Sequence, residues 1–312
     1  MRATQTTTYR SLQAFLDRTS DKLQSLQLQA ATGKRINRPS DDPTAISPVL
    51  SARTQIQTSD RYVETIETGL DRIDNMDGYL DSIENTLVRI KEISIASVNG
   101  IMSDQDLLTY ADEVSQLRAA LLDDSNAQVD GRYLFAGFSE KTEPFAAADP
   151  SLPVSSTNPV VYAGDNGKLE FEIAPNELIG VNLTGNALML GDADNDGVTD
   201  AGSVDIFALV TQLEEALRAG DQMAVEGLID PLETAADQVR SQRSIKGNVG
   251  SRLLVARDHM EQIKIDMEEY RSRFEDADIL ETITSLEQQQ QSFQAALSVT
   301  GKVSELSILD YL

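Results

Sequence analysis

The stretch GDADNDGVTD (residues 191–200) carries aspartates at the spacing of a calcium-binding loop. Side-chain oxygens at the first, third, fifth and ninth positions of such a loop hold the ion, and glycine at the sixth position makes its sharp turn. The residues at those positions are Asp192, Asp194, Asp196, Asp200 and Gly197. The twelfth position, where a glutamate completes the ligand set, is Ser203, and no helix is predicted before Asp192. We therefore interpret the stretch as an acidic turn and assign no metal ligand; a calcium-dependent structural or interaction module is an alternative.

His259 is the only histidine and the second candidate for chemistry. A zinc-binding helix needs a second histidine one turn away, and a Ser-His-Asp relay needs a nucleophile on a sharp turn. The sequence supplies neither partner, so we expect His259 to be a solvated residue of a helix. The sequence also has no glycine-rich phosphate loop, and no cysteine for a thiolate site or a disulfide. We predict no catalytic residue, no cofactor and no enzymatic activity.

The basic residues Lys34, Arg35 and Arg38 form a third group, which could contact phosphate. They have no aromatic neighbours to stack on bases, and Asp41 and Asp42 follow closely. Over the whole chain 51 acidic residues outnumber 26 basic ones, and the formal net charge of −25 repels nucleic acid and anionic lipid. We therefore predict that the group forms ion pairs between proteins, and that nucleic acid is not a partner.

Long helices must position these residues. Near both ends of the chain, apolar or small residues alternate spacings of four and three, which is typical of the narrow stripe of a coiled-coil seam. We predict that the two terminal stripes form an assembly interface, with the basic group at the joint that follows the first stripe. The predicted interface residues are Leu12, Leu16, Leu23, Leu26, Phe293, Leu297, Val303 and Leu306, together with Lys34, Arg35 and Arg38.

The two terminal arms differ in charge. Residues 1–40 carry seven Lys or Arg against two Asp, and residues 275–312 carry seven acidic residues against one Lys. Because opposite charges attract, we predict that ion pairs help the N- and C-terminal helices to pair within one subunit.

Between the arms, residues 54–98 contain no proline and carry two seven-residue apolar ladders, Ile66–Ile73–Leu80–Leu87 and Met76–Ile83–Ile90. A helix of roughly 45 residues would be about 65 Å long, which indicates a rod rather than an element of a compact domain. Asn99 and Gly100 end this helix. Ser103 then caps a second, returning helix, so the pattern predicts an antiparallel pair.

The joint at residues 33–47 has the residues that end one helix and begin another. Gly33 can take the left-handed conformation that ends the first arm. Asp42-Pro43 and Ser47-Pro48 are each a capping residue followed by proline, which suits the first position of a helix. We predict that each of these dipeptides marks a start of the next helix.

Residues 137–203 differ in composition from the helical segments, because they contain five prolines and many Gly, Asn and Asp. The short runs VVYAG (160–164), LEFEI (169–173) and GVNLTG (180–185) predict strands joined by turns. Helix is predicted to resume at residues 204–217, and a long apolar pattern from Leu253 leads to the C-terminal arm.

Together these patterns predict a mainly α fold: an elongated antiparallel helical rod or coiled coil, with paired N- and C-terminal helical arms and a small β-rich inserted domain. The predicted domains are an arm domain (1–42 with 275–312), a rod domain (43–136 with 204–274) and an insertion (137–203). An amphipathic helix of about 30 residues without a partner is marginal in water. We therefore expect the arms to be disordered in the monomer and ordered by assembly.

The joint and both arms resemble the bacterial flagellin family. LQAATGKRINRPSDDPTAI (28–46) is similar to its N-terminal signature, with Thr32 where the family usually has Ser, and residues 274–312 are similar to its C-terminal signature. The segments DGRYLFAGF (130–138), TEPF (142–145) and SILDYL (307–312) are more similar to the hook-associated members of the family than to filament flagellin.

The resemblance implies a structural subunit of the bacterial flagellum that joins hook to filament. It implies export in an unfolded form with a chaperone, without a cleaved signal peptide, to an extracellular place on the flagellum. The implied partners are further copies in a ring, a neighbouring hook-associated protein and flagellin; membrane insertion is not expected. Filament flagellin is the nearest alternative, and a calcium-dependent module or a surface enzyme on a helical stalk are the others.

Overall fold

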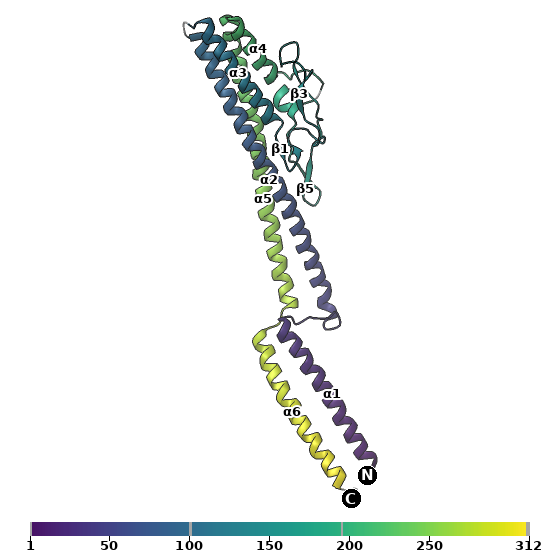
Figure 1. The fold of residues 1–312 in the computed structure, drawn as a ribbon. Coiled ribbons are helices and arrows are strands. Elements are labelled where there is room, and N and C mark those ends of the chain that lie inside the picture. The colour runs from purple at the N-terminus through teal and green to yellow at the C-terminus, as the bar shows by residue number, and fades with distance from the viewer. Residues whose placement is uncertain (1, 100–101, 195, 310–312) are drawn as a thin grey trace. The chain divides into compact units, whose positions relative to one another are not determined.

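The computed structural model describes residues 2–99, 102–194 and 196–309, with the side chains of residues 2–6, 8, 9 and 303–309 outside this description. Long helices dominate the chain (Figure 1), so the predicted fold class is confirmed. The α-helices are α1 (Arg2–Thr32), α2 (Pro43–Asn99), α3 (Asp104–Ser125), α4 (Ile206–Ala219), α5 (Gln222–Glu275) and α6 (Ile279–Leu309).

Between α3 and α4 lie short strands, which pair into two-stranded antiparallel sheets. The strands are β1 (Gln128–Val129) with β2 (Arg132–Tyr133), β3 (Phe145–Ala147) with β4 (Val160–Tyr162), and β5 (Glu170–Ala174) with β6 (Glu177–Gly180). One π-helical turn, η1 (Asn186–Leu190), precedes α4.

The chain divides into two compact units. The arm unit comprises Met1–Asp60 and Glu261–Leu312, and the central unit comprises Arg61–Met260. The boundaries at residues 60 and 261 fall inside α2 and α5, whereas the predicted boundaries at residues 42 and 275 coincide with the ends of these helices at the joint. The three-domain division stays a prediction.

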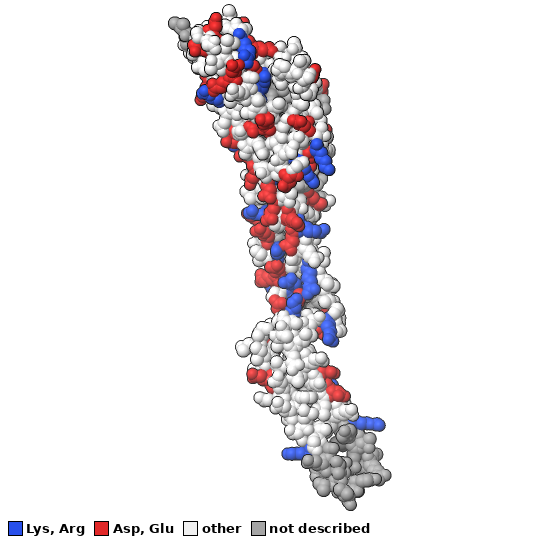
Figure 2. Space-filling view, in the orientation of Figure 1, with Lys and Arg blue, Asp and Glu red and all other residues white. Residues whose placement is uncertain are grey.

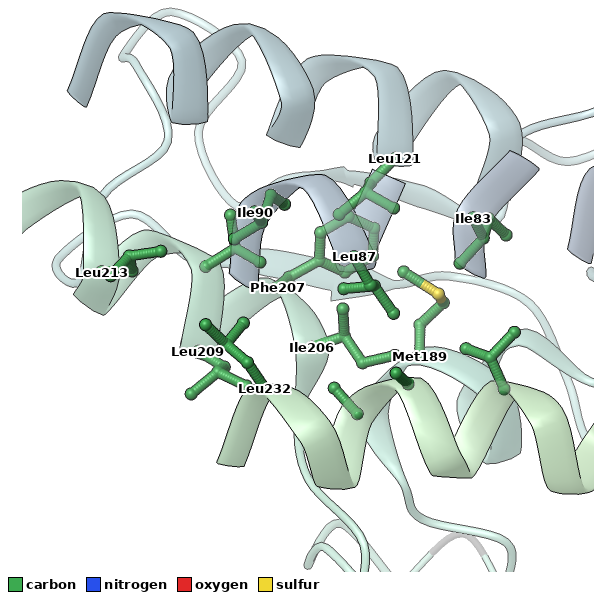
Figure 3. Packing of buried hydrophobic residues seen from close by; sticks show 14 of the residues in the cluster. Ile83, Leu87, Ile90, Leu121, Met189, Ile206, Phe207, Leu209, Leu213 and Leu232 are labelled. Carbon is green, nitrogen blue, oxygen red and sulfur yellow. The ribbon is translucent and has the colours of Figure 1, made fainter. Parts of the chain in front are cut away.

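The central unit has a hydrophobic core to which the helices and the β-rich segment both contribute. Both predicted ladders of α2 are buried; Met76, Ile83 and Ile90 are almost fully covered. Figure 3 shows side chains of α2, α3, α4 and α5 packed against one another. Phe145 of β3 and Leu188 of η1 belong to the same buried cluster, so the insertion packs on the helices.

The cap at Ser103 is confirmed, and only one of the two predicted starts of α2 is right. Ser103 Oγ accepts the Asp106 N–H at 3.3 Å, and the Asp106 carboxylate accepts the Ser103 N–H at 3.2 Å. Asp42 Oδ1 accepts the N–H groups of Thr44 and Ala45, both at 3.2 Å, so α2 begins at Pro43. Pro48 therefore lies inside the helix, and its predicted role at the first position is wrong.

Two of the three predicted strand runs are confirmed, in β4 and β5. The third, GVNLTG (180–185), is wrong, because β6 ends at Gly180. Beyond that point Val181 and Leu183 are buried in the core, and the Asn182 side chain bonds to the backbone of residues 167 and 169. Val181 and Leu183 thus pack into the core, while Asn182 between them bonds to the backbone. This alternation of apolar and polar residues led to the prediction of a strand.

The DGRYLFAGF segment supplies two turns that only a few residue types tolerate. Asp130 and Gly131 have φ of 52° and 73° and turn β1 into β2. Gly137 has a φ of 71°, and a Cβ atom there would lie 2.1 Å from the Asp165 carbonyl oxygen. The Asp165 carboxylate accepts the Phe138 N–H at 2.7 Å. Burial acts to raise the pKa of Asp165, but its hydrogen bonds prevail and the pKa is lowered.

Candidate assembly interface

Helices α1 and α6 pack side by side and run antiparallel (Figure 1). Thr19 and Leu26 of α1 are buried, as are Thr282 and Ala296 of α6. Gln289 of α6 donates from Nε2 to the Thr19 carbonyl oxygen at 3.1 Å. These residues define a seam that joins the two terminal arms within one subunit.

The structure places five of the eight apolar residues predicted for the interface on this seam. Leu26 is buried, and the others on the seam are half-buried: Leu12, Leu16, Leu23 and Phe293. Leu297 lies off the seam and is 49% exposed. The side chains of Val303 and Leu306 lie outside the described residues. The seam thus uses within one subunit much of the apolar surface that was predicted to contact neighbours.

A second apolar surface covers the outer faces of the same two helices. Leu280 is 79% exposed, although leucine usually lies inside. The outer apolar set consists of Phe15, Leu28, Ile279, Leu280, Ile283, Leu297 and Val299. Of this set only Leu297 belongs to the predicted interface residues. Large apolar side chains exposed on paired helices are typical of surfaces that bind another protein.

The predicted basic group divides in two at the joint. Lys34 Nζ lies 2.5 Å from Glu275 Oε1, and Arg35 Nη1 lies 3.1 Å from Asp42 Oδ2. Both residues therefore form ion pairs within the subunit. The Arg38 guanidinium has no ion pair with any residue that the structure describes, and its side chain is exposed. Of the three cations, Arg38 is the one free to pair with a neighbouring protein.

Ion pairs between the two ends of the chain lie at the joint, and the predicted attraction between the terminal helices themselves stays a prediction. No ion pair joins α1 to α6 among their described side chains. Among the described residues, the ion pairs that join the N-terminal and C-terminal segments of the arm unit are Lys34 and Arg53 with Glu275, and Lys264 with Asp60. Most of the net charge counted at each end belongs to the joint or to residues beyond the described side chains, so apolar packing pairs the arms.

The two units differ strongly in charge. The central unit has 35 acidic and 14 basic residues, a formal net charge of −21, and the arm unit has 16 acidic and 12 basic residues, −4. In Figure 2 red acidic side chains are spread over the visible face of the central unit, and few charges mark the visible described part of α1 and α6. The nearly neutral arm unit can pack against further copies with little charge repulsion.

The acidic loop brings three of its aspartates together. Carboxylate oxygens of Asp192, Asp194 and Asp196 all lie within 4.8 Å of one another. Several are already hydrogen-bonded by the loop: Asp192 accepts the Gly197 N–H at 2.9 Å, and Asp196 accepts the Val198 N–H at 2.8 Å. These bonds fit the acidic-turn interpretation.

His259 is exposed on α5, as predicted. No helix in the described part of the chain is both long and apolar enough to cross a membrane.

Paired terminal helices with a second, outer apolar surface are typical of a structural subunit that assembles with other proteins. Comparison with known families places the chain within that class. The bacterial flagellin N-terminal helical region matches residues 4–140, and the C-terminal helical region matches residues 229–312. The chain belongs to the bacterial flagellin family.

Individual relatives differ in how much of the chain they match. Flagellar hook-associated protein 3 of Escherichia coli is 24% identical over 295 residues, which cover 90% of both chains. The flagellar filament 30.7 kDa core protein of Treponema maltophilum is 35% identical over 123 residues, 38% of this chain and 42% of that protein. The filament protein is thus similar over a limited region, and the hook-associated protein over almost the whole length.

Solved structures share the fold. A putative flagellar hook-associated protein from Vibrio parahaemolyticus has a TM-score of 0.64 and 18% identity, over 76% of this chain and all of that one. The flagellar junction protein FlgL from Legionella pneumophila has a TM-score of 0.58 and 16% identity, over 75% of this chain and all of that one.

Proposed function

We propose that this chain is a hook-associated structural subunit of the bacterial flagellum, which joins the hook to the filament. The observation that carries the proposal is the match to a hook-associated protein over 90% of both chains. The partners would be further copies in a ring, a neighbouring hook-associated protein and flagellin. An export chaperone and secretion to the cell exterior without a cleaved signal peptide are part of the same proposal.

The arm unit supports this proposal physically. The seam between α1 and α6 covers one face of each helix, and the outer apolar set remains for neighbours. Burial of apolar surface contributes about 25 cal/mol per Å², which offsets the entropy lost on ordering. Arg38 adds a charge for pairing at the joint. Contacts of this kind between different patches are heterologous, and they generate tubes or rings.

Labelling of this protein on isolated flagella tests the function. We expect one discrete signal at the hook end of each filament, because a junction subunit occupies only that position. The matched control is the same label on flagella from cells that lack the protein. Continuous decoration of the filament would instead support filament flagellin, which the limited match to the filament core protein makes the second candidate. Signal away from flagella would contradict both.

The free monomer should have labile arms. Two helices that cover only one face of each other lack the packing that holds the central core, so we expect the amide protons of α1 and α6 to exchange faster than those of α2 and α3 near Ile83 and Leu121. Hydrogen exchange of the dilute protein measures this difference directly. Equal protection of the arms and the central unit would show that assembly does not order them.

A further inference from the structure

Glu275, the last residue of α5, brings together cations from three parts of the arm unit. Its side chain is 1% exposed. Lys34 Nζ lies 2.5 Å and Arg53 Nη2 2.6 Å from its Oε1 atom, and Arg271 Nε lies 3.6 Å from its Oε2 atom. Lys34 belongs to the joint, Arg53 to α2 and Arg271 to α5, so a single carboxylate links all three segments.

The backbone around Glu275 ties the same segments together. Its carbonyl oxygen accepts the N–H groups of Arg35 at 2.7 Å and Ile36 at 3.4 Å. The Ala277 N–H donates to the Gly33 carbonyl oxygen at 2.9 Å, and Lys34 pairs with residue 276 in an isolated antiparallel bridge. The segment that leaves α1 is therefore bonded to the segment that enters α6.

Around Glu275, positive charges outnumber negative ones. Among the described residues, Glu275 is the only acidic partner within ion-pair distance of Lys34, Arg53 or Arg271. Burial acts to raise the pKa of Glu275, but hydrogen bonds from Lys34 and Arg53 prevail and lower it, so the group is ionised near neutral pH. Loss of its charge would leave three cations facing one another around a covered position.

We propose that Glu275 is the positioning residue of the joint, which presets the directions of α1 and α6 so that a subunit can be incorporated. This inference rests on the proposed function. A joint that is already ordered loses less conformational entropy when neighbours bind, and preorganisation of this kind increases the gain from the same contacts. Glu275 lies in the arm unit, so this role is separable from the folding of the central unit.

The test compares Glu275→Gln with Glu269→Gln. Both changes replace one carboxylate of α5 by an amide of equal size, but Glu269 pairs with Arg273 at an exposed site, where an ion pair contributes little. A hydrogen bond between charged groups is stronger than a neutral one, and its loss at a covered site is costly. We therefore expect Glu275→Gln to speed exchange of the Arg35, Ile36 and Ala277 amides at least about tenfold. It should also lower incorporation into flagella that lack the protein by about tenfold, with the urea midpoint of the central unit unchanged.

A second variant separates charge from shape. Adding Lys34→Gln to Glu275→Gln removes one of the three mutually repelling cations, so it should restore part of the lost amide protection. Wild-type exchange rates in Glu275→Gln would overturn the proposal. Faster exchange with normal incorporation would overturn it as well, because joint order would then not matter for assembly. If the wild-type protein were absent from the hook end, the proposed function would be contradicted instead. The exchange result would still test the role of Glu275 independently.

Discussion

Deletion of residues 1–30 is expected to abolish incorporation into the flagellum and to leave the central unit folded. The deletion removes nearly all of α1, including Thr19 and Leu26, and so uncovers the seam face of α6. It leaves every residue of Arg61–Met260 in place. Purified variant is added to flagella that lack the protein, and incorporation is measured by labelling. Circular dichroism and urea unfolding report on the central unit.

Two point variants on α1 give the deletion a matched control. Leu26→Ala removes a buried side chain of the seam, and Leu28→Ala removes an exposed one of the outer apolar set. If the arms act as proposed, Leu26→Ala loosens the α1–α6 pair before assembly, which hydrogen exchange detects. Leu28→Ala leaves the monomer unchanged and weakens incorporation alone. Incorporation of the deleted protein at the wild-type level would refute the role of the arms.

Local signals in the sequence predicted the helical elements well. The ladders of α2 followed from spacing alone, because a seven-residue apolar repeat keeps one face of a helix covered. Gly33 has a φ of 70°, and its N–H bonds to the Gln29 carbonyl oxygen at 2.9 Å, as expected of a left-handed helix end. The capping box at Ser103 is likewise a property of neighbouring residues.

Features that depend on distant residues could not be predicted in the same way. Glu275 and Arg53 are 222 positions apart, and no local pattern pairs them. Net charge at the two ends suggested attraction but did not show that ion pairs lie at the joint. The outer apolar set was not distinguished from the seam, because a stripe of spacing four and three does not show which of its residues a partner helix covers.

The insertion depends on the helices for its core. A composition rich in Pro and Gly predicted a β-rich inserted domain at residues 137–203. Its buried residues, Phe145 and Leu188 among them, belong to the same cluster as buried residues of the helices. Strands as short as those here cannot form a stable sheet alone. Packing against α4 supplies the missing apolar surface.

Phe207→Ala is therefore expected to destabilise the insertion and the helices together. Phe207 of α4 is 1% exposed, and its ring centroid lies 5.4 Å from that of Phe145 in β3. Phe145 in turn lies 5.2 Å from Tyr162 in β4. Removal of a buried aromatic ring costs about 3–5 kcal/mol, because the cavity is only partly refilled. Total stability of a domain is about 5–15 kcal/mol, so the expected loss is a large part of it.

Urea unfolding of the central unit, followed at the same time by helical circular dichroism and by amide exchange in β3 and β4, measures the effect. Both probes should shift to the same lower midpoint, since one core serves both parts. The matched control is Phe138→Ala, which removes a ring that is 63% exposed and should cost less than about 1 kcal/mol. If β3 and β4 lost protection while the helices kept the wild-type midpoint, the insertion would be a domain of its own, and the shared core would not determine its stability.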